Sequence, residues 1–197
     1  MPTISTHLHF GKNLIESSAD EVDIRSFILG MVSPDTYDDN TFEEIHNLDD
    51  DGNLDIREFY EKFDFKKLNF QEKSYVLGYY SYLWFDEYYK FNASKLKINN
   101  YNDLSDDELK VAIENLFKFY DSKAIGNFYD DFIRDINEYK LNINLKEIKN
   151  INMQKVKDKL SEYFKYQVSN EVYSYLINED KYMNFIKKGC SKIIKSL

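Results

Sequence analysis

The side chains best suited to chemistry in this sequence are histidines and aspartates in its first half. All three histidines, His7, His9 and His46, lie near the beginning of the chain. None accompanies a serine in a nucleophile-elbow pattern, and there is no glycine-rich phosphate loop, so the sequence disfavours a nucleophilic triad. Imidazole and carboxylate together suit zinc or another first-row divalent ion. The candidate metal ligands, each in or beside an apolar segment, are His7, Asp35, His46 and Asp86.

Asp86 stands in the most apolar part of the chain, the segment SYVLGYYSYLWFDEYYK (74–90). At helical spacing this aspartate shares a face with Tyr75, Tyr79, Tyr82 and Tyr89. The opposite face is also apolar, which predicts a helix over 71–91 that runs through the middle of a bundle. A carboxylate at such a place must be paired, protonated or bound to a metal, because an isolated buried charge is costly.

The rest of the chain also predicts helices. Glycine (6) and proline (2) are scarce, which leaves little turn chemistry for a many-stranded sheet. Hydrophobic periodicity places further helices over 6–16, 21–29, 40–46, 56–63, 105–120, 127–139, 153–164, 170–177 and 180–194. The segment 141–152 is predicted to be a loop or an irregular helix. We therefore expect a single all-α domain, residues 1–197, built as a bundle of about eight to nine helices.

Two local features bear on the candidate ligands. In the first helix, His7 is predicted to face inward, whereas His9 points elsewhere and is expected to be partly exposed. After the second helix, Pro34 is expected to force Ser33 into an extended conformation, so that Asp35 leaves the helix end in a fixed direction.

Charge and composition restrict the partners of the protein. The formal net charge of -9 argues against binding to nucleic acid, and the C-terminal lysines 187, 188, 192 and 195 are interpreted as a solvated helix face. The single cysteine, Cys190, excludes an internal disulfide. No signal peptide and no transmembrane segment are recognised, so we expect a cytoplasmic protein, whose oligomeric state the sequence leaves open.

Three segments, in this order, resemble the zinc-dependent phospholipase C family: THLHFG (6–11), FILGMVSPD (27–35) followed by Ile45 and His46, and GYYSYLWFDEYY (78–89). The resemblance covers about the first 90 residues. It implies an all-helical fold that is shared with single-strand-specific zinc nucleases. It also implies up to three zinc ions in a cleft, where a metal-activated water hydrolyses phosphodiesters.

Carried over residue by residue, the resemblance makes His7, Asp35 and His46 metal ligands and Asp86 a ligand that bridges two metals. The family has a histidine four residues before that aspartate, where this chain has Tyr82. It also has two more histidines downstream, whereas this chain has none after position 46. We therefore expect a reduced site with one zinc ion, in which the Tyr82 hydroxyl donates a hydrogen bond in the outer shell or to the transition state.

The acidic segment NLDDDGNLDIRE (47–58) gives a second metal hypothesis, because it matches the calcium loop of EF-hands. Its candidate oxygen ligands are Asn47, Asp49, Asp51, Asp55 and Glu58. EF-hands normally occur in pairs, and no second loop is present. The alternative is an acidic, solvated turn before a helix whose first turn favours Asp and Glu.

The sequence thus predicts a metal-dependent phosphoester hydrolase with Asp86 and Tyr82 as catalytic residues and a small-molecule or lipid phosphoester as substrate. One alternative is a non-catalytic helical binding or structural protein that retained the fold after losing zinc ligands. In that case, His7 and Asp86 form a buried hydrogen-bonded pair. The other alternative is calcium binding through the 47–58 loop.

Overall fold

The chain folds into helices arranged around one long central helix. The computed structural model describes residues 2–18, 21–36, 41–48, 52, 54–99, 104–148, 151–163 and 174–196, and in these ranges it contains nine α-helices and no strand. The α-helices are α1 (Ile4–Ser17), α2 (Ile24–Val32), α3 (Phe42–Ile45), α4 (Ile56–Glu61), α5 (Phe70–Asn92), α6 (Asp106–Ile125), α7 (Asp130–Ile133), α8 (Met153–Tyr163) and α9 (Glu179–Ile193). Two short 3-10 helices, η1 (Ser33–Thr36) and η2 (Ala93–Lys95), extend α2 and α5. The predicted all-α class is confirmed.

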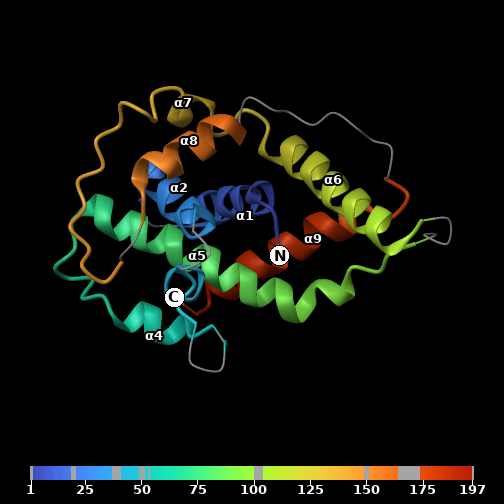
Figure 1. Cartoon of the computed structure of the whole chain (residues 1–197), viewed down its shortest axis with the longest axis horizontal. Coiled ribbons are helices and arrows are strands. Elements are labelled where there is room, and N and C mark those ends of the chain that lie inside the picture. Colours follow the sequence, from blue (N-terminus) through green and yellow to red (C-terminus); the bar gives the residue numbers. More distant parts are fainter. Residues whose placement is uncertain are drawn as a thin grey trace.

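Helix α5 crosses the middle of the molecule, as its apolar composition predicts (Figure 1). It begins at a capping box, in which the side chain of Asn69 accepts from the backbone N–H of Glu72 and the Glu72 side chain accepts from Asn69 in return. Helices α1, α2, α4 and α9 all pack against it. Most of its side chains from residue 74 to residue 88 are buried, so any polar group on this helix needs a partner in the core.

Helices α2 and α5 cross with their backbones in contact, and two glycines make this possible. A β-carbon at Gly30 would lie 2.0 Å from the Tyr75 carbonyl oxygen, and one at Gly78 would lie 2.0 Å from the Phe27 carbonyl oxygen. Any larger residue at either position would push the helices apart. The close crossing fixes the position of the C-terminal end of α2, and therefore the position of Asp35, which follows it.

Helix α1 presents its two histidines to different parts of the molecule. Two residues are about 200° apart on an α-helix, so His7 and His9 face nearly opposite directions. His7 lies against Phe85 of α5, whereas His9 lies against Asp121 of α6 and Tyr182 of α9. The expectation that His9 is partly exposed is wrong, because its exposed fraction is only 3%.

The predicted helix over 127–139 is largely absent, since only α7 forms there. The Lys157 amine donates to the carbonyl oxygens of Asn137 and Tyr139, and the Tyr139 hydroxyl lies 2.6 Å from an Asp23 carboxylate oxygen. These tertiary bonds hold the end of the segment, in which turns with mixed i→i−3 and i→i−4 backbone bonds follow α7. The predicted helix over 170–177 is also not found in its described part, 174–177, which forms a turn.

The expectation of an extended Ser33 is wrong as well, because the residue is helical (φ -55, ψ -45). Its hydroxyl donates to the Leu29 carbonyl oxygen at 2.7 Å and lies 2.6 Å from the Tyr75 hydroxyl. These buried bonds outweigh the preference of a residue that precedes proline. Asp35 therefore stands in a 3-10 turn that continues α2.

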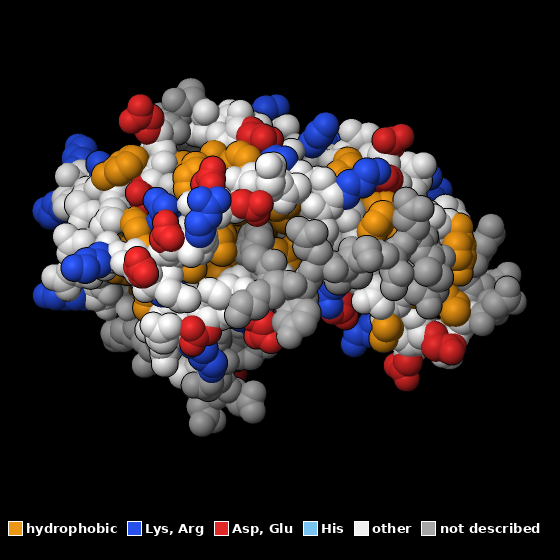
Figure 2. Space-filling view, turned by 90° about the horizontal axis from the view of Figure 1, so that it is seen from above, with side chains coloured by type: hydrophobic (Ala, Val, Ile, Leu, Met, Phe, Trp, Pro, Cys, Tyr) orange, Lys and Arg blue, Asp and Glu red, His pale blue; other side chains and the backbone are white. Residues whose placement is uncertain are grey.

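Positive and negative side chains alternate over the face that carries α7 and α8, with hydrophobic side chains between them (Figure 2). Among the residues drawn in colour, this face shows no large area of one charge sign. Among the described residues, no helix is both long and apolar enough to cross a membrane.

Candidate functional site

The candidate site centres on His7 of α1 and Asp86 of α5. The His7 Nε2 atom lies 3.3 Å from the Asp86 Oδ1 atom, but the geometry is not that of a hydrogen bond. Neither these two atoms nor His7 Nδ1 has a hydrogen-bond partner among the described residues. The His7 side chain is 1% exposed and that of Asp86 is 14% exposed. The hydrogen-bonded pair considered from the sequence is therefore not what the structure shows.

Tyr82 contacts His7 through its aromatic ring and not through its hydroxyl. The two rings stack at 3.9 Å between centroids and 19° between planes, and Phe85 meets the imidazole edge-on at 5.6 Å. The Tyr82 hydroxyl points toward Asp35 Oδ1 at 3.5 Å, the long limit of a hydrogen bond. Tyr82 thus lies between His7 and Asp35, and its proposed catalytic role stays a prediction.

His46 approaches the same region from the end of α3. Its Nδ1 atom is 2.9 Å from the Phe42 carbonyl oxygen, and since a carbonyl can only accept, Nδ1 carries the proton and Nε2 the lone pair. Burial lowers the pKa of His46, and the Phe42 carbonyl and the carboxylates of Asp86 and Asp35 offset this only in part. The imidazole is therefore neutral at neutral pH, which is the state that binds metals. The Tyr79 hydroxyl donates to the Ile45 carbonyl and so ties this segment to α5.

Asp35 is held by a lysine that the sequence analysis did not single out. The Lys159 amine of α8 lies 2.9 Å from Asp35 Oδ2 and also donates to the Asp35 backbone oxygen. The carboxylate is 25% exposed, so the pair stands at the edge of the site. In the sequence, Lys159 is one of several polar positions on an amphipathic helix, and no pattern marks it as a partner of Asp35.

A cavity of about 390 Å³ opens above Asp86 and His46. Its wall is mainly apolar and includes Phe42, Leu48 and Leu54. A ligand of small-molecule size can therefore reach the carboxylate of Asp86 and the ring of His46, while His7 lies behind them.

The separation of His7 and Asp86 allows a test of whether they could hold a metal ion. In a tetrahedral zinc site with ligand bonds of about 2.0–2.1 Å, neighbouring ligand atoms are about 3.3 Å apart and do not hydrogen-bond to each other. The Nε2 to Oδ1 distance of 3.3 Å and the missing hydrogen-bond geometry match this arrangement. Within the described ranges, however, no three His, Cys, Asp or Glu side chains form a complete metal-binding group. The pair fits two ligands of one ion, and His46 is the neighbouring side chain suited to be the third.

A second histidine–aspartate pair lies on the other side of α1. Asp121 is fully buried and accepts from three groups: His9 Nδ1 at 2.9 Å, the Thr6 hydroxyl at 2.8 Å and the Tyr182 hydroxyl at 2.8 Å. Burial and the nearby carboxylate raise the pKa of Tyr182 well above its usual range, so its hydroxyl stays a donor. The sequence does contain a signal for this pair, because Asp121 stands four residues after Phe117 on the apolar face of its helix.

In the described part of the acidic loop, the side-chain oxygen atoms interact with other groups of the protein. Asn47 Oδ1 accepts from the Lys62 amine at 2.5 Å, and Asp55 Oδ1 caps α4 by accepting from the backbone of Glu58 at 2.8 Å. The Glu58 carboxylate is 3.7 Å from the same lysine. Asp49 and Asp51 lie outside the described residues, so calcium binding stays a prediction.

Comparisons of the chain with protein-family models, with curated proteins and with solved structures find no match. The resemblance to zinc-dependent phospholipase C therefore rests on three short segments and remains a prediction. What the structure adds is that His7, Tyr82 and Asp86 from two of these segments are in contact or close to it, and that Asp35 of the remaining segment lies beside Tyr82.

Proposed function

We propose that this protein binds one first-row divalent metal ion, zinc by preference, at His7, Asp86 and His46. The observation that carries the proposal is the buried His7–Asp86 pair, whose facing atoms are 3.3 Å apart without a hydrogen bond. Burying such polar atoms without partners costs about 1–3 kcal/mol each. A metal ion would satisfy both atoms at once.

Each residue has a part that follows from its surroundings. Asp86 supplies negative charge at the bottom of the cavity. His46 presents a lone pair because the Phe42 carbonyl fixes its other nitrogen. His7 is kept in one plane by Tyr82 and Phe85. Binding requires the segment that carries His46 to close on the pair, since the three groups do not form a complete site in the described structure.

We further propose that the metal site serves hydrolysis of a phosphoester in the cavity. A bound zinc ion would supply an activated water and neutralise charge on the phosphoryl group. The order of the three family-like segments supports this reaction class. Tyr82 in place of a histidine and the engagement of Asp35 with Lys159 favour one ion over three.

The metal is tested by elemental analysis of the purified protein after dialysis without chelator. We expect near-stoichiometric zinc, manganese or iron in the unaltered chain and its loss in Asp86→Asn and His7→Gln. Glu87→Gln is the matched control, because it removes one negative charge from the same cavity at the next residue. Equal metal content in Asp86→Asn and the unaltered chain would refute the site.

Turnover is tested separately with bis(p-nitrophenyl) phosphate and with phospholipid. Hydrolysis that is lost in Asp86→Asn and kept in Glu87→Gln supports the hydrolase. Bound metal without hydrolysis of either substrate would instead favour the second candidate, a non-catalytic binding protein of the same fold. The observations that favour this second candidate are the ion pair that occupies Asp35 and the tyrosine at position 82.

A further inference from the structure

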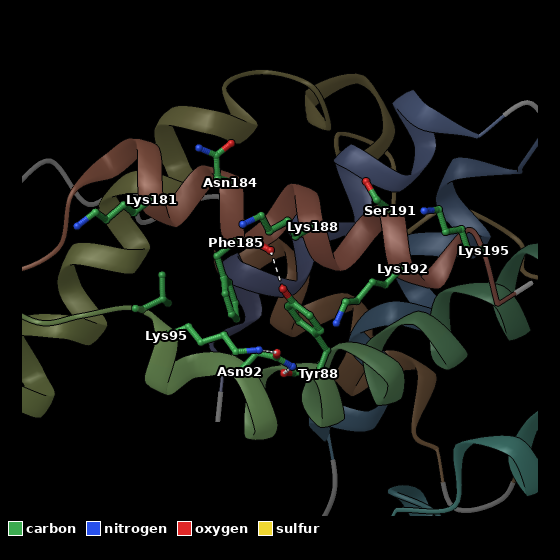
Figure 3. A pocket seen from close by; sticks show the side chains of 11 residues that line it. Tyr88, Asn92, Lys95, Lys181, Asn184, Phe185, Lys188, Ser191, Lys192 and Lys195 are labelled. Carbon is green, nitrogen blue, oxygen red and sulfur yellow. Dashed lines mark hydrogen bonds between the residues drawn. The ribbon is translucent and has the colours of Figure 1, made fainter.

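A second hollow lies on the side of α5 that faces away from Asp86, between the end of α5 and α9. Its volume is about 580 Å³. In the described part of the chain, no aspartate or glutamate lines it. Five lysines do: Lys95, Lys181, Lys188, Lys192 and Lys195. We call this hollow the lysine pocket (Figure 3).

Among the described residues, no carboxylate forms an ion pair with the lysines of the pocket. Elsewhere in this acidic chain lysines pair with carboxylates, as Lys123 does with Glu179 of α9 at 2.8 Å. Within the pocket, the Lys95 amine donates to the neutral Asn92 side chain at 2.5 Å, and the Lys192 amine lies 5.4 Å from the centre of the Tyr88 ring. None of the five has an ion pair among the described residues. Their mutual repulsion would be relieved by a bound anion.

Helix dipoles do not explain all of these positions. Lys192 is in the last turn of α9 and Lys95 ends the 3-10 extension of α5, where a positive charge is favourable. Lys181 stands near the N-terminus of α9, where it is unfavourable, and Lys188 stands in the middle of the helix. The helix ends therefore account for only two of the five lysines.

The bottom of the pocket is aromatic. Phe185 of α9 and Tyr88 of α5 meet with ring centroids 5.0 Å apart, and the Tyr88 hydroxyl donates to the Phe185 carbonyl at 3.3 Å. Figure 3 shows Lys192 and Lys95 extending toward Tyr88 from opposite sides, whereas the amines of Lys181 and Lys195 point away from the rings at the two ends of α9. Tyr88 and Phe185 are at most 8% exposed, so they offer little apolar surface for insertion into a lipid layer.

We propose that the lysine pocket binds a soluble anion that carries two or more phosphate groups. The amines of Lys95 and Lys192 lie on two sides of Tyr88, with Lys188 also lining the pocket, and this arrangement matches a compact ligand with several negative charges. Binding of this anion does not depend on the proposed metal site, which lies on the other side of α5. Lys188, Lys192 and Lys195 are exposed, as expected for a solvated helix face, and the proposal gives them a binding role in addition.

The test is isothermal titration calorimetry of the purified protein with sodium tripolyphosphate at physiological ionic strength. We expect saturable binding at one site per chain, weakened about tenfold or more in the double variant Lys188→Gln/Lys192→Gln. The matched control is Lys66→Gln/Lys73→Gln, which removes the same charge from two exposed lysines near the other end of α5. This control should bind tripolyphosphate like the unaltered chain. Asp86→Asn should do so as well, which would show that binding in the lysine pocket does not depend on the proposed metal site.

Equal weakening in both double variants, or no saturable binding, would overturn the proposal. A parallel measurement uses sedimentation with vesicles of phosphatidylcholine alone and of phosphatidylcholine with phosphatidylserine. Binding to the anionic vesicles without binding of tripolyphosphate would overturn the soluble ligand in favour of a membrane surface. All substituted lysines are on the surface, so thermal unfolding should show the variants folded.

Discussion

Helix α1 carries two histidines two residues apart, and each faces an aspartate of another helix. His9 and Asp121 are 2.9 Å apart in a network that also includes Thr6 and Tyr182. His7 and Asp86 are 3.3 Å apart, with their facing atoms outside any hydrogen bond. The first pair is sealed in the core, whereas the carboxylate of the second opens into a cavity.

The difference shows how the same two residue types can serve stability or function. A buried carboxylate with three donors is fully satisfied and holds α1, α6 and α9 together. A buried pair without hydrogen bonds contributes little to folding and is retained at a cost. Such a cost is expected where a ligand completes the site, which is why the proposed metal ion is placed at His7 and Asp86 and not at His9 and Asp121.

The largest expected effect tests this contrast in the metal-free protein. Asp121→Asn leaves an amide with only one acceptor oxygen for three donors, so it should lower the free energy of unfolding by about 3 kcal/mol. Asp86→Asn removes a carboxylate that lacks such partners and should change it by less than about 1 kcal/mol in either direction. Urea unfolding measures both values. A similar loss for the two variants would mean that both pairs are structural.

A smaller effect is expected from restoring the histidine that the family-like pattern places at position 82. Because the Tyr82 ring already stacks on His7, Tyr82→His would put a second imidazole beside the proposed metal position. We expect zinc to bind about tenfold more tightly, as measured by competition with a chromogenic chelator. Tyr88→His, on the opposite side of α5, is the control and should leave the affinity unchanged; a gain in both would exclude a specific site.

The smallest effect concerns pH and again uses the metal-free protein. Burial lowers the pKa of folded His46 below its ordinary value of 6.5. As the pH falls below about 6.5, the unfolded chain therefore takes up the proton first and stability decreases, whereas above that pH the full contribution is present. Thermal unfolding between about pH 7.5 and 5.5 should show this slope. His46→Gln should reduce it, and an unchanged slope would show that His46 is not buried as a neutral imidazole.

Sequence patterns predicted most of the fold because the helices carry strong local signals. The apolar segment around Asp86 predicted α5, and the Ser105–Glu108 pair marked the start of α6, where the capping box is found. The predictions failed where turns held by tertiary hydrogen bonds take the place of a regular helix, as before Tyr139, and where buried bonds override the preference before proline, as at Ser33.

The sequence by itself determined the helical class, the central position of α5 and the inward direction of His7, because each follows from periodicity along a single helix. Only the tertiary structure decided which aspartate each histidine meets, that Lys159 pairs with Asp35, and that lysines from α9 and from the end of α5 line one hollow. These are contacts between segments far apart in the chain, and local periodicity carries no information about them. Helix packing decides them instead, as two glycines do for the crossing of α2 and α5.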